Sequence, residues 1–206
     1  MKTRFLMQQT IIAAALLITC GAANAGLTFV PTDTAIRTEA FNIGGFATLP
    51  VGSTLSIGHL DYTGPGSQTV TYTFLGQESG FNNKFYDNLG GTTLLESDPI
   101  GTSVSSLVSA FGPLNFKFEG DIGKFAFNGG HWDKGTSIGL IGTNMLVGST
   151  TYQYVIGYND SAGKKHLGDW DDFVIGVSAV PEPETYAMML IGLCLIGFSI
   201  RKQKVR

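Results

Sequence analysis

The segment Thr69-Val70-Thr71-Tyr72-Thr73-Phe74 alternates a polar residue with an apolar one over six positions. Successive side chains on a β-strand point to opposite faces of the sheet, so this period of two predicts a strand. We expect Val70, Tyr72 and Phe74 to share its buried face. A half-buried strand of this kind implies a sheet that covers a core on one side and meets water on the other.

The same alternation recurs elsewhere in the chain. Leu114, Phe116 and Phe118 alternate with polar residues, and Phe125 and Phe127 flank Ala126. Further predicted strands cover residues 54–60, 137–141, 151–158 and 173–177. In 151–158 the residues expected on one face are Tyr152, Tyr154, Ile156 and Tyr158.

Glycine-rich sequences such as Gly64-Pro65-Gly66 and Asn128-Gly129-Gly130 separate these segments and are typical of turns. None of the segments shows a helical stripe of period 3.6, although residues 102–110 are predicted to form one short helical turn. About eight to ten short strands with frequent turns predict an all-β domain, an antiparallel β-sandwich of jelly-roll type.

The first 25 residues have the features of a secretory signal peptide. Lys2 and Arg4 precede an uncharged stretch that ends in Ala23-Asn24-Ala25. The small residues Ala23 and Ala25 suit signal peptidase, which would leave Gly26 as the first residue of the exported protein. Two alternatives stay open: an uncleaved anchor helix, and lipoprotein processing at Cys20.

The other end of the 206-residue chain also has a membrane-directed pattern. Residues 185–200 carry no charge and are followed by the basic tail 201–206. A transmembrane helix over 186–200 would be only about 23 Å long, but snorkelling of Arg201 and Lys202 extends its reach. The basic tail places the C-terminus in the cytoplasm and the preceding chain outside it. The alternative is a buried core helix.

Val180-Pro181-Glu182-Pro183 stands immediately before this apolar segment, and its two prolines forbid a helix there. Together with the apolar segment and the basic Arg201 and Lys202, it resembles the PEP-CTERM sorting signal over residues 180–206. The resemblance implies a Gram-negative bacterium whose exosortase processes the tail near Pro-Glu-Pro. The chain would then be a transient inner-membrane intermediate on its way to the cell surface or extracellular matrix.

Between the two ends, residues 26–179 are predicted to form one exported domain. They carry seven Lys and Arg against 14 Asp and Glu, a net charge of −7. This acidity argues against nucleic-acid binding, which needs clustered basic residues. Both cysteines, Cys20 and Cys194, lie outside the domain, so burial and not a disulfide must stabilise it.

The densest acidic segment is Asp169-Trp170-Asp171-Asp172, with Asp160 shortly upstream. Calcium is bound by six to eight oxygen atoms, and these aspartates could supply the charged ones. The predicted calcium ligands are Asp160, Asp169, Asp171 and Asp172. The alternative is a turn in which the aspartates bond to backbone N–H groups and fix the start of the last strand.

Two tryptophans, Trp132 and Trp170, are candidates for stacking on a sugar ring, and anchoring of a loop is the alternative for Trp132. The sequence contains no Gly-x-Ser-x-Gly elbow, phosphate loop or His-Glu-x-x-His motif. We therefore expect a non-enzymatic surface protein that contributes to matrix, exopolysaccharide or biofilm structure. The alternatives are a calcium-dependent carbohydrate-binding module and a glycan-active enzyme.

Overall fold

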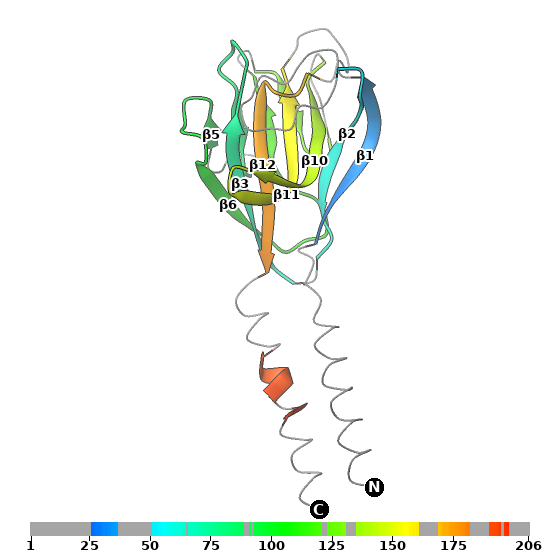
Figure 1. Cartoon of the computed structure of the whole chain (residues 1–206), viewed down its shortest axis with the longest axis vertical. Coiled ribbons are helices and arrows are strands. Elements are labelled where there is room, and N and C mark those ends of the chain that lie inside the picture. The colour runs from blue at the N-terminus through cyan, green and yellow to red at the C-terminus, as the bar shows by residue number, and fades with distance from the viewer. Residues whose placement is uncertain are drawn as a thin grey trace, which may run out of the picture.

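A computed structural model describes residues 26–36, 51–64, 66–88, 91, 93–120, 123–130, 135–160, 169–181, 190–194 and 196–197. They form two antiparallel sheets packed together (Figure 1). The predicted β-sandwich is thereby confirmed, and its jelly-roll subtype stays a prediction. The predicted signal peptide lies outside the described residues.

The larger sheet has eight strands in the order β1-β2-β10-β11-β12-β3-β6, with β7 paired to β2. These strands are β1 (Leu27–Ile36), β2 (Thr54–Tyr62), β3 (Gln68–Gly76), β6 (Ser103–Val108), β7 (Gly112–Pro113), β10 (Ser137–Val147), β11 (Thr150–Asn159) and β12 (Phe173–Pro181). The last strand of the chain, β12, therefore lies inside the sheet between β11 and β3.

The smaller sheet has four strands in the order β5-β4-β8-β9. They are β4 (Lys84–Tyr86), β5 (Thr93–Leu95), β8 (Lys117–Glu119) and β9 (Phe125–Phe127). Its inner face packs aromatic rings against the larger sheet. Phe85 lies 4.9 Å from Tyr72, and Phe118 lies 5.1 Å from Tyr158, between ring centroids. Burial of one such ring stabilises the fold by roughly 1.5–3 kcal/mol.

The alternation that predicted β3 is confirmed. Val70, Tyr72 and Phe74 are buried in the core between the sheets, whereas Thr69 and Thr71 are half-buried on the other face. The alternation of buried Leu114, Phe116 and Phe118 with more exposed neighbours is confirmed as well.

The helical turn predicted for residues 102–110 is wrong, because most of this segment is strand β6. Hydroxyl pairs with β3 explain the difference: Thr71 bonds to Ser105 at 2.8 Å, and Thr73 bonds to Ser103 at 2.9 Å. The threonine hydroxyl groups of β3 are hydrogen-bond partners that Ser103 and Ser105 reach only when their segment is a strand beside β3.

Two further details differ from simple alternation. Ala126 is the residue of β9 that faces the core, while Phe125 and Phe127 lie half-buried near the Lys117 ammonium. In β11, Tyr152 leaves the face of its even-numbered neighbours and packs with Val155 in a separate cluster.

Near the C-terminus, residues 190–194 and 196–197 have a helical backbone. Within the parts of the chain that the structure describes, no helix is both long enough and apolar enough to cross a membrane. Most of the predicted membrane helix 186–200, together with the basic tail 201–206, lies outside those parts.

Candidate functional site

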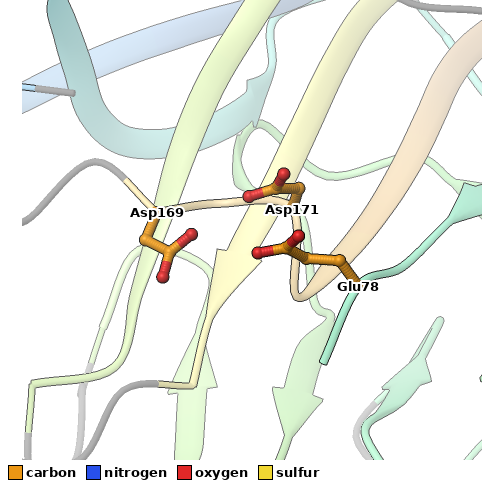
Figure 2. Close-up of side chains that lie close together, drawn as sticks. All are labelled: Glu78, Asp169 and Asp171. Carbon is orange, nitrogen blue, oxygen red and sulfur yellow. The ribbon is translucent and has the colours of Figure 1, made fainter. Parts of the chain in front are cut away.

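An acidic cluster forms where β3 ends and β12 begins. Gly76 is opposite Val174 in the ladder, so the residues after β3 and those before β12 must meet. Carboxylate oxygens of Glu78, Asp169 and Asp171 lie within 4.8 Å of one another. Figure 2 shows Glu78 and Asp171 side by side, with Asp169 across from them. Like charges at this separation repel, which makes the cluster a candidate for binding a cation.

The loop backbone holds this cluster together. The Glu78 amide donates to the Asp171 carbonyl oxygen at 2.9 Å, which joins the end of β3 to the start of β12. Carboxylate oxygens are ligands that calcium prefers, so this donor set fits a hard cation. Three carboxylates are fewer than its six to eight ligands, so carbonyl groups or water would complete the shell.

Asp160 and Asp172 form a different, hydrogen-bonded network next to the cluster. The Asp160 carboxylate accepts from Ser79 at 2.7 Å and from Asn83 at 2.6 Å. The Asp172 carboxyl accepts from the Asp160 amide at 2.7 Å. These two residues therefore do what the structural alternative predicted: they bond to the backbone and polar neighbours and fix the start of β12.

Burial raises the pKa of Asp172 well above its ordinary value, and the nearby carboxylates of Asp160 and Asp169 raise it further. Removal of a carboxylate from water and proximity of like charges both favour the neutral form. The raised pKa favours the neutral form of the Asp172 carboxyl, which suits a hydrogen-bonding role better than a role as a charged metal ligand.

Trp170 lies between these acids and is completely buried. Its indole N–H donates to the Ser137 hydroxyl at 3.0 Å, and its ring packs over Gly139 of β10. Gly157 of β11, the ladder partner of Gly139, lies against the backbone carbonyl and Cβ of Trp170. A Cβ at Gly139 would lie 1.9 Å from the indole, so only glycine leaves room for the ring. The glycan role predicted for Trp170 is wrong, because no ring face is open to a sugar.

The predicted metal set is thus divided. The structure brings Asp169 and Asp171 together and places Asp160 and Asp172 in the neighbouring network. It adds Glu78, whose place beside the aspartates depends on the β3–β12 pairing of residues about a hundred positions apart in the sequence. The other glycan candidate, Trp132, lies outside the described residues.

At the opposite end of the larger sheet, both ends of the domain meet at Gln68. The Gly26 amide donates to the Gln68 side chain at 3.2 Å, and Pro181 is the ladder partner of Gln68. We call this end the base, made of residues 26–28, 62–64, 66–70, 106–112 and 179–181. Figure 1 shows β12 pointing towards it. Strand β12 thus continues two residues beyond the boundary predicted at residue 179.

The residues of the base carry no charge, and one acid, Asp61, lies at its margin as the ladder partner of Thr28. Strand β3 spans about 26 Å from Gln68 to Gly76, so the acidic cluster lies at that distance from the base. The domain therefore has an end with few charges, from which the C-terminal tail departs, and an acidic end far from it.

A comparison with protein families matches residues 179–204 to the PEP-CTERM protein-sorting motif. The chain is an exported protein of the kind that an exosortase sorts. It is accordingly an exosortase substrate and a cell-surface protein, and the predicted sorting signal is confirmed. Searches of curated proteins and of solved structures found no match to the chain.

The raised pKa of Asp172 predicts a pH-dependent stability. Between the ordinary carboxyl pKa and the raised one, the folded state holds a proton that the unfolded state has lost, so stability falls as pH rises. The slope is at most ~1.4 kcal/mol per pH unit. Asp172→Asn imitates the protonated side chain, and we expect it to remove this slope and to stabilise the protein near pH 7.5.

The measurement is the urea unfolding free energy of both full-length proteins in detergent micelles at pH 4.5, 6.0 and 7.5. The difference between variant and parent should grow with pH. A difference that stays constant over this range would show that Asp172 ionises normally.

Proposed function

We propose that this chain is a non-enzymatic surface protein whose sandwich domain is delivered through its sorting tail to the extracellular matrix. The observation that carries the proposal is the direct continuation of β12 into the sorting motif, which starts at residue 179 inside the strand. The domain and its sorting signal are thus one continuous piece, with signal peptidase acting at Gly26 and an exosortase at the tail.

The distribution of charge supports an orientation for the exported domain. Its base, with Asp61 as the one acid at its margin, adjoins the tail, while Glu78, Asp169 and Asp171 lie at the opposite end. An anionic membrane surface repels carboxylates, so this arrangement keeps the acidic end away from the bilayer during sorting. The same end then faces the matrix, where exopolysaccharide and divalent cations are the partners that suit it.

The sorting tail offers the first test. Replacement of Pro181, Glu182 and Pro183 by alanine, or deletion of residues 201–206, should leave most of the protein uncleaved in the membrane fraction. The physical reason is that the first change removes the motif and the second removes the basic anchor that fixes the topology. Cell fractionation and immunoblotting in the producing bacterium provide the measurement.

The matched control is Gly80→Ala, a change at an open loop position at the acidic end, far from the tail. It should be processed and released like the parent. Normal release of the tail variants would contradict the exosortase assignment.

As a second candidate function we propose calcium-dependent binding at Glu78, Asp169 and Asp171. What supports it is the approach of three carboxylates from two distant segments. An ion there would neutralise the mutual repulsion of the acids and connect the loop before β12 to the end of β3. A carbohydrate could then complete the coordination shell of the ion with its hydroxyl groups.

Addition of about 10 mM CaCl2 to the full-length protein in detergent should raise its melting temperature by roughly 3–8 °C, if the affinity is that of extracellular calcium modules. Glu78→Gln with Asp171→Asn should abolish the rise. Asp33→Asn, a change of an acid outside the cluster, should retain it. An equal response of all three proteins to calcium would place the ion elsewhere, and the absence of any shift in the parent would remove the calcium candidate.

A further inference from the structure

The sorting motif begins within a hydrogen-bonded strand. Its first three residues, Ala179, Val180 and Pro181, are the ladder partners of Val70, Thr69 and Gln68 in β3. An extended peptide is recognised by pairing its free backbone groups with those of the receptor. Backbone groups that already bond to β3 are not free for a protease, so the sheet restricts where the chain can be cut.

The edge of β12 that faces β11 is hydrogen-bonded almost as far along the strand as the edge that faces β3. Pairing with β11 ends at Tyr154 and Val177, but the Gln153 side chain then accepts a hydrogen bond from the Ala179 amide at 2.7 Å. Backbone N–H groups of alternate residues in a strand point to the same side, so position 181, like Ala179, faces the β11 side. The ladder with β11 has already ended there, at Val177. A proline fits at this position because no ladder bond is lost there.

Upstream residues of β12 belong to the core. Phe173, Ile175 and Val177 are completely buried between the two sheets. Detachment of the strand to expose an upstream bond would therefore bring these side chains into water and leave the β3 ladder unpaired. The sheet thus disfavours every cut before its last paired residue.

We propose that the sorting protease cuts this chain on the C-terminal side of Pro181 while β12 is still paired with β3. This inference rests on the proposed function, in which an exosortase processes this chain. It adds a limit on where along the chain the cut can fall. The mature protein would keep the whole of β12, and both of its processed ends would lie at Gln68 in the base. The folded domain, and not an unfolded chain, would then be what the protease receives.

The first test is the intact mass of the protein released by the producing bacterium. We expect a C-terminus at Pro181 or at a later residue. A C-terminus before Pro181 would overturn the inference but would still agree with processing of the chain by an exosortase. A chain that still ends at Arg206 would instead overturn the proposed function, so the two failures are distinguishable.

The second test fixes β12 in the sheet by a disulfide. Thr71 and Ser178 are direct partners in the β3–β12 ladder, and the exported domain contains no cysteine of its own. Thr71→Cys with Ser178→Cys should form a disulfide after export, because antiparallel partners lie within bridging distance. Cys194→Ser serves as the background, so that no other thiol competes.

The disulfide-locked protein should be processed to the same extent, within twofold, as the Ser178→Cys single variant in the same background. Full-length locked protein that is processed only after reduction would show that β12 must leave the sheet, which overturns the inference. Should the double variant fail to accumulate, the C-terminal mass of the parent protein decides alone.

Discussion

The packing of Trp170 against Gly139 and Gly157 is the constraint on which the acidic end of the molecule depends. The two glycines face each other on β10 and β11. The missing side chain of Gly139 leaves the space that the indole fills, and that of Gly157 leaves room for the backbone carbonyl and Cβ of Trp170. Trp170 also belongs to a buried cluster with Ala35 of β1 and with Leu55 and Ile57 of β2. This residue thus packs the segment before β12 onto the larger sheet, which fixes the flanking aspartates and the point where β12 begins.

From that point, β12 links the two functional ends of the protein. It starts beside Glu78, Asp169 and Asp171, runs through the core between β11 and β3, and ends at Pro181 inside the sorting motif. A continuous strand between the acidic end and the start of the sorting motif fixes the separation of these two features, which a flexible linker would not do. The pairing at Gln68 brings the start of β1 to the same place.

Local patterns in the sequence predicted the parts that depend on neighbouring residues. Alternation located β3 and the 114–118 segment, and the ordered tail motif identified the sorting signal. The sequence could not predict which strands lie side by side, and three features followed from that pairing. Glu78 joins the aspartates only because β3 lies beside β12, Ser103 and Ser105 become a strand only beside the threonines of β3, and Trp170 is buried only because two distant glycines face each other.

The most direct test of this account is the unfolding free energy of Gly139→Ala compared with that of Gly80→Ala. The new Cβ at position 139 would lie 1.9–2.2 Å from three indole atoms, whereas at position 80 it would meet nothing within 4 Å. We predict that Gly139→Ala loses at least ~2 kcal/mol relative to Gly80→Ala, because Trp170 must move or the strands must separate. Equal stabilities, within ~0.5 kcal/mol, would contradict the central role of this contact.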